Sequence, residues 1–217
     1  MPQNVLRWLL ALAALCSLST ASADWPAEVG EALTLYRNDE LQPAEQLARR
    51  IAAASADPQT RSEARLIQLL VHLRSPERKL QLDSRAELLE RATQRPDLLQ
   101  RPEVEHALGL AALAQRETTN AIDLLQRAAA RFEARGLNAL AASARIAIAE
   151  AWAVHGEWEL TPRAWIDERP RSSEEAQSLR IAKVMALDQD LARLGPAGAA
   201  AQNEVKLILG RLYLTED

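Results

Sequence analysis

Aromatic residues, glycine and cysteine are all scarce in this chain of 217 residues. Phe, Trp and Tyr together make up 4% of the sequence, and there are 7 glycines and one cysteine, Cys16. Residues branched at Cβ are also few, and extended sheet is built mainly from such residues and from aromatics. The composition therefore argues against a fold built from β-strands.

Motifs that carry chemistry are missing as well. His72, His106 and His155 have no second histidine at a zinc-binding helix spacing, no serine lies in a G-x-S-x-G turn, and no glycine-rich phosphate loop is present. The net charge of −4 comes with no basic stripe interleaved with aromatics, which disfavours a nucleic-acid interface. We predict no catalytic residues, metal, cofactor or nucleic-acid partner. Acids that are distant in sequence could still meet in space, so a helical enzyme or small-ligand-binding domain remains an alternative.

Residues 1–23 have the organisation of a secretory signal peptide. Arg7 supplies the positive start, residues 8–16 form a short apolar segment, and residues 21–23 (Ala-Ser-Ala) have the form of a cleavage site. The apolar segment is shorter than the roughly 20 residues that span a bilayer. We expect export to the periplasm with cleavage after Ala23, which leaves no cysteine and no disulfide in the remaining chain. The alternative is an uncleaved anchor that tethers the chain to a membrane.

The rest of the chain reads as helix throughout. Ala, Leu, Glu, Arg and Gln favour helix, and apolar residues recur three and four positions apart. We predict about ten helices: residues 25–38, 41–54, 58–73, 80–93, two helices within 105–131, 137–155, a short helix after Thr161, 172–194 and 199–213. In the fourth of these, the spacing places Leu82, Ala86, Leu89 and either Ala92 or Thr93 on the inward face.

The segment 105–131 resembles a tetratricopeptide repeat. Leu108-Gly109 matches the start of the family pattern, Ala121 follows Gly109 by twelve residues, and Leu125 stands where the family has Phe. Small residues at Gly109 and Ala121 predict that the two helix backbones approach closely. The segment also departs from the pattern, because Glu105 occupies the position of the family's Trp.

A second, weaker match begins at Ala149 in the glycine position. Trp152 and Trp165 then fill the two aromatic positions, where we expect both to pack between helices. The resemblance implies an all-α fold, a right-handed α-solenoid of stacked antiparallel helix pairs. Repeats would occupy residues 24–170, and a C-terminal helix pair at 171–217 would cap them.

The resemblance also implies a concave groove lined by the first helix of each pair. Projecting the pattern gives Glu103, His106, Leu110 and Leu113 from one pair, and Ser143, Ile146, Glu150 and Ala153 from the next. Trp158 lies in the turn after Gly156 and is a candidate exposed anchor. The Lys and Asn residues with which some family members clamp a terminal carboxylate are missing here, so we expect an apolar or basic ligand segment, such as a helix. The predicted function is a periplasmic scaffold that binds a partner protein or peptide in an envelope complex.

Overall fold

The structure, a computed structural model, describes residues 25–154 and 173–214. Nearly all of these residues are helical and none lies in a β-strand, so the prediction of an all-α fold is confirmed. Within these ranges the elements are η2 (Ala27–Val29), α2 (Gly30–Arg37), α3 (Leu41–Ala54), α4 (Pro58–Leu73), α5 (Arg78–Gln94), η3 (Pro96–Gln100), α6 (Pro102–Ala114), α7 (Thr118–Ala134), α8 (Asn138–Val154), α9 (Ser173–Ala192) and α10 (Pro196–Leu214). None of these helices is both long and apolar enough to cross a membrane.

The helix boundaries follow the sequence closely. The predicted ranges 41–54 and 58–73 coincide with α3 and α4, and the predicted range 80–93 lies inside α5. The short helix predicted after Thr161 lies outside the described residues.

Local chemistry explains several of these boundaries. Asp57 caps α4, because its Oδ2 accepts a hydrogen bond of 2.7 Å from the backbone N–H of Thr60. Gly136 follows α7 with a φ of 70°, and Gly195 precedes α10 with a φ of 64°. Backbone of that conformation is costly for residues with a Cβ atom, so glycine at these two turns ends one helix and lets the next begin.

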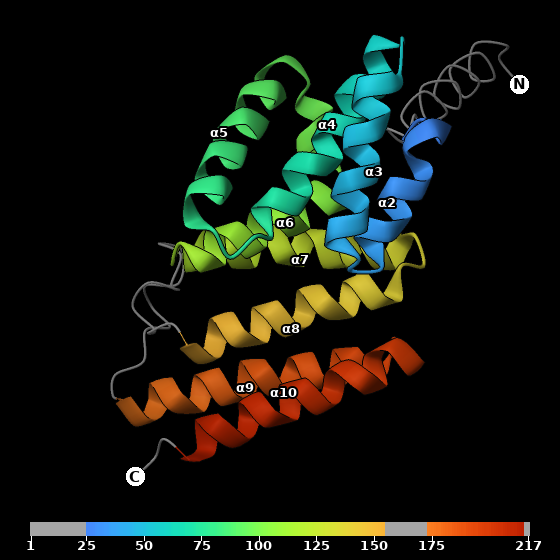
Figure 1. Cartoon of the computed structure of the whole chain (residues 1–217). Helices are drawn as coiled ribbons and strands as arrows, with labels where there is room; N and C mark the ends of the chain where they lie inside the picture. Colours follow the sequence, from blue (N-terminus) through green and yellow to red (C-terminus); the bar gives the residue numbers. More distant parts are fainter. Residues whose placement is uncertain (1–24, 155–172, 215–217) are drawn as a thin grey trace, which may run out of the picture.

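Helices that follow one another in the chain pack side by side (Figure 1). α6 packs on α7, α7 packs on α8, and α10 contacts both α8 and α9. The group α2–α5 stands across the direction of α6–α10, and α4 contacts α6 where the two groups meet. The arrangement is compatible with the predicted solenoid, and its direction of stacking changes at α6.

Gly109 in α6 faces α7 at close range. A Cβ atom on Gly109 would lie 2.7 Å from Cγ of Leu125 and 3.4 Å from the backbone oxygen of Ala121. Because Cβ contacts shorter than 3.0 Å are essentially never observed, any larger residue would force the side chain of Leu125, or the helix that carries it, to move. The predicted close approach of Gly109 and Ala121 is therefore confirmed.

The predicted inward face of α5 is wrong at Leu82, Ala86 and Leu89, whereas Ala92 is buried as predicted. Leu82 and Leu89 are 44% and 43% exposed, and the residues that α5 buries are Gln81, Ser84, Leu88 and Ala92. The side-chain amide of Gln81 donates a hydrogen bond of 2.6 Å to the backbone oxygen of Ser75, which turns this polar residue inward. α5 packs mainly on α4 and η3, so only a narrow row of its side chains is buried.

Candidate functional site

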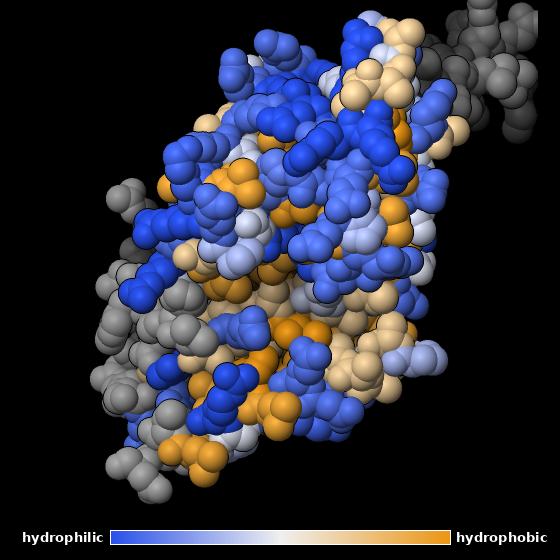
Figure 2. Space-filling view, viewed as in Figure 1, coloured by the Kyte–Doolittle hydropathy of each residue, from blue (hydrophilic) through white to orange (hydrophobic). Residues whose placement is uncertain are grey.

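A groove of about 420 Å³ lies between α6, α8 and α10, close to the end of α4. In Figure 2, apolar atoms gather across the middle of the molecule, below the mostly hydrophilic surface of α2–α5. The residues that line the groove are Arg74, Leu110, Ala139, Ala142, Ser143, Ile146, Ala147, Glu150, Ala197, Ala200, Ala201 and Glu204.

Small side chains dominate this lining. Along α8, Ala139, Ala142, Ile146 and Glu150 recur three or four residues apart, so they lie on one face of the helix. α10 contributes alanines to the opposite wall. Because helix axes approach more closely where side chains are small, the groove offers a surface on which a further helix could lie.

The charged residues of the groove differ in what they contact. Arg74 donates a hydrogen bond of 2.6 Å to Asp39 and lies 5.6 Å from the ring centre of Tyr36, so its charge is already engaged. Glu150 and Glu204 are exposed, and neither forms an ion pair within the described residues. The unpaired charge of the groove is therefore negative.

Four of the nine residues predicted to line the groove or to anchor a partner meet in this groove; one of them is Ser143 of α8, whereas Ala153 does not line it. Leu110 comes from α6, whereas Ile146 and Glu150 come from α8. Leu113 is half-buried and packs with Leu110 against the apolar cluster of α7 and α8, so it does not line the groove. Trp158 lies outside the described residues.

Glu103 and His106 do not reach the groove, contrary to the prediction, because both are buried. Oε1 of Glu103 accepts a hydrogen bond of 3.0 Å from Nε of Arg37, which joins α6 to α2. The ring of His106 meets Phe132 edge to face, with 5.7 Å between the ring centres. The physical reason is that α4 packs on α6 and Arg37 of α2 binds Glu103, while the first turns of α6 are buried, so only its last turns remain open to the groove.

Burial also changes the chemistry of His106. Neither ring nitrogen has a hydrogen-bond partner among the residues that the structure describes, and burial, helped by the charge of Arg74, lowers the pKa of His106 to about 3. The imidazole is therefore neutral at ordinary pH. It contributes to the core and to the pH dependence of stability.

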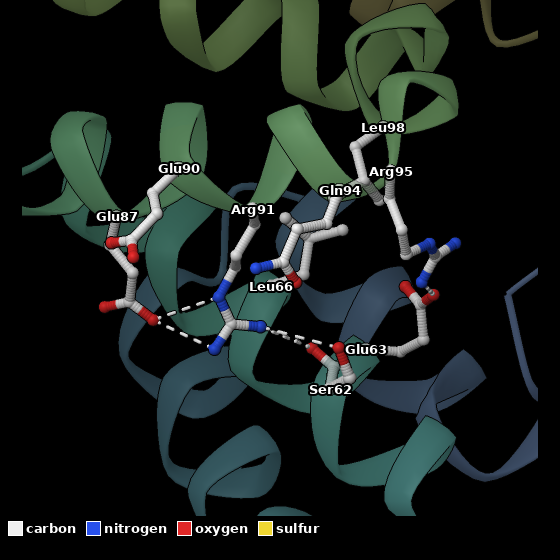
Figure 3. Close-up of a pocket in the computed structure, with 9 residues that line it drawn as sticks. All are labelled: Ser62, Glu63, Leu66, Glu87, Glu90, Arg91, Gln94, Arg95 and Leu98. Carbon is white, nitrogen blue, oxygen red and sulfur yellow. Dashed lines mark hydrogen bonds and ion pairs between the residues drawn. The ribbon is translucent and has the colours of Figure 1, made fainter.

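A second hollow, of about 370 Å³, lies between α4, α5 and η3 (Figure 3). Arg91 bridges the two helices, since its Nε lies 3.1 Å from Oε1 of Glu87 and its Nη1 lies 3.4 Å from the backbone oxygen of Ser62. Nη1 of Arg95 donates to Oε1 of Glu63 at 2.8 Å. Each of these two carboxylates thus has an arginine partner.

This pairing decides what the second hollow can do. A general acid needs a carboxyl group whose pKa is raised toward neutrality. The hydrogen bond from Arg65 instead holds the pKa of Glu87 below its usual value. The hollow is therefore a set of ion pairs that joins α4 to α5. Sequence reasoning missed it, because the contacts that join α4 to α5 and η3 connect residues 22 to 32 positions apart, and only the pair Glu87–Arg91 has a helix spacing.

Trp152 contributes to a third hollow, of about 290 Å³, between α7, α8 and α9. Its ring is half-buried, and Nζ of Lys183 lies 5.9 Å from the ring centre. Ile148 lies one turn earlier on the same side of α8, opposite the face that lines the groove. The packing expected for Trp152 between helices is therefore only partial. Trp165 lies outside the described residues.

Within residues 25–154 and 173–214, no group of three or more His, Cys, Asp or Glu side chains is placed to hold a metal ion. The chain matches no family model, no curated protein and no solved structure. The groove is the strongest candidate site, because it gathers residues from three helices and carries unpaired charge.

Proposed function

We propose that the protein is an exported helical scaffold, which binds a basic α-helical segment of a partner protein in the groove between α6, α8 and α10. The supporting observation is the lining of the groove, where small and apolar side chains surround the carboxylates of Glu150 and Glu204, neither of which has an ion-pair partner among residues 25–154 and 173–214. Amphipathic helices bind in such grooves through residues that recur at intervals of three and four.

The dimensions of the groove fit a helix of about three turns. The lining residues of α8 extend from Ala139 to Glu150, which corresponds to roughly 16 Å of helix at 1.5 Å per residue. A bound helix would place small or medium apolar side chains against Ile146 and Leu110. Bulky aromatic side chains would hold it away from the alanines.

The charges favour a basic segment. Lys or Arg at the edge of the bound helix would lie close to Glu150 and Glu204, and complementary charge increases both the association rate and the specificity of binding. An acidic segment would instead meet two like charges. Arg74 offers it little compensation, because Asp39 already binds that guanidinium.

The location in the cell envelope follows from the N-terminal sequence alone. Residues 1–23 have the pattern of a signal peptide, and cleavage after Ala23 would release a chain that begins at Asp24. N-terminal sequencing of the protein recovered from the cell envelope tests this directly. A start at Met1 would contradict export with cleavage and favour a membrane tether.

Site-specific cross-linking in intact cells tests the binding proposal. A photoreactive residue replaces Ala139, which is exposed in the groove, or Ala130, which is also exposed but lies on α7 outside the groove. We expect one dominant adduct from position 139 and none from position 130, and we expect the attached segment to be basic with a helical apolar pattern. Equal adducts from both positions, or an acidic segment at position 139, would contradict the proposal.

A further inference from the structure

α10, the last helix of the stack, leaves an apolar face uncovered. Leu207 is 68% exposed and Leu214 is 79% exposed. Ala200, Leu207 and Leu214 are spaced seven residues apart, so they lie on one face of α10. Figure 2 shows hydrophobic and hydrophilic residues side by side along the lower edge of the molecule, where α10 lies. The terminal helix of a stack normally presents a polar outer face, because that face meets water.

Gly210 lies on the same side of α10, and no side chain or backbone of the described residues packs against it. A Cβ atom there would meet nothing within 4 Å, whereas Cβ atoms on Gly109 and Gly198 would meet Leu125 and the backbone of Leu191. Glycine in a helix interior is destabilising relative to alanine. At Gly210 nothing in the described part of the chain compensates for that cost, whereas close approach by a second chain would.

Two opposite charges flank this face on one edge. Glu204 lies three residues before Leu207, and Arg211 lies four residues after it. Both side chains are exposed, and neither has an ion-pair partner in the described part of the chain. Leu207 therefore lies at the centre of this face. Along the helix, an acid precedes Leu207 and a base follows it at nearly the same distance.

We propose that α10 packs antiparallel against α10 of a second copy of this chain, about a twofold axis that passes beside Leu207. In an isologous contact of this kind, a residue before the axis meets the residue at the same distance after it. Leu207 therefore meets the partner's Leu207, and the small Ala200 faces the partner's larger Leu214. Glu204 lies opposite the partner's Arg211, and symmetry repeats this pair on the other side of the axis.

The interface predicts a weak dimer. The contacting stretch from Ala200 to Leu214 is roughly 21 Å long, and contact along one helix lies at the low end of specific interface areas, below about 1,200 Å². We expect dissociation constants in the micromolar range, on the order of 1–100 µM. Because Glu204 also lines the groove, dimerisation and binding of a basic segment use the same carboxylate.

Sedimentation velocity on the purified protein, over about 1–200 µM, tests the proposal. We expect concentration-dependent dimers for the wild type. Arg211→Glu replaces both symmetry-related Glu204–Arg211 pairs with two opposed carboxylates, and it should weaken the dimer about tenfold. Adding Glu204→Arg to that variant exchanges the two charges and should restore the dimer. Lys206→Glu makes the same change of charge on an exposed residue of α10 outside this face, and should leave the dimer as in the wild type.

A wild type that stays monomeric over this range would overturn the proposal. So would a charge exchange that fails to restore the dimer while the far-UV circular dichroism remains that of the wild type. Oxidation of Leu207→Cys in a Cys16→Ser background gives a second readout. We expect a disulfide-linked dimer from position 207. The control Leu82→Cys, at an exposed position of α5 in the same background, should give none. The substitutions at Arg211 and Leu207 lie outside the groove lining, so failure of the dimer leaves the proposed groove function intact.

Discussion

The carboxylate of Glu63 accepts hydrogen bonds of 2.5 and 3.1 Å from the guanidinium of Arg101, and both side chains are almost completely buried. The guanidinium also lies 4.6 Å from the ring centre of Trp25, in the first part of the described chain. One ion pair thus connects α4, the start of α6 and the N-terminal segment. It lies where the two groups of helices meet.

Removing Arg101 should therefore destabilise the fold strongly. We expect Arg101→Met to lower the free energy of unfolding by about 3–5 kcal/mol, because Glu63 would keep only its contact with the half-exposed Arg95. Combining it with Glu63→Leu should recover most of the loss, since no buried charge is then left without a partner. Urea denaturation measures both. The exposed Lys79–Asp83 pair is the control, and Lys79→Met should leave the urea midpoint unchanged. An equal loss of stability from Lys79→Met and Arg101→Met would contradict the role of the Glu63–Arg101 pair.

The crossing of α6 and α7 depends on the absence of a side chain at Gly109. We expect Gly109→Leu to destabilise the protein by about 1–3 kcal/mol, because its Cβ alone would lie 2.7 Å from Leu125. Gly210→Ala is the matched control, since its Cβ meets nothing and alanine favours helix. At protein concentrations that keep the chain monomeric, this control should stabilise by about 0.5–1 kcal/mol. A Gly109→Leu protein that melts like the wild type would refute the close crossing.

His106 should make stability depend on pH. Its pKa in the folded chain is about 3, below the ordinary value of 6.5, so between these values the unfolded chain binds one more proton than the folded chain. Stability should therefore fall as the pH is lowered through this window, by about 1.4 kcal/mol per pH unit from this residue. We expect His106→Leu to remove that part of the slope between pH 6.5 and 5, measured by urea denaturation. An unchanged slope would show that the imidazole titrates normally.

Neighbouring leucines on α5 should differ in their effect on stability. Leu88 is buried, so Leu88→Ala should cost about 2–5 kcal/mol. Leu89 is 43% exposed, and Leu89→Ala should change stability by no more than about 0.5 kcal/mol. Equal losses at both positions, measured by thermal or urea unfolding, would mean that α5 is rotated from the orientation described here.

The sequence predicts the helices better than it predicts their buried faces. Spacing and capping residues are local signals, which is why α3 and α4 begin and end as expected. The face that α5 buries is not local, because it depends on where Gln81 finds a hydrogen-bond acceptor and on what α4 presents. Leu82 and Leu89 have the right spacing for an inward face, but polar contacts decide the rotation of the helix.

The groove was predicted only in part for a similar reason. The repeat pattern locates Leu110, Ile146 and Glu150 correctly in one groove, because it depends on the order of helices within a pair. It places Glu103 and His106 there as well, because it assumes that every pair stacks in the same direction. The change of direction at α6 buries these two residues, and it adds Arg74 and the alanines of α10 to the groove.

Binding of the cross-linked partner segment, prepared as a synthetic peptide, is the most direct test of the groove as the functional site. Isothermal titration calorimetry would compare the wild type with Ala139→Trp, which fills the groove, and with Ala130→Trp, which places the same side chain on α7 outside it. We expect at least about a tenfold loss of affinity for Ala139→Trp, equivalent to roughly 1.4 kcal/mol, and wild-type affinity for Ala130→Trp. Equal affinity of all three proteins for the peptide would contradict binding in this groove.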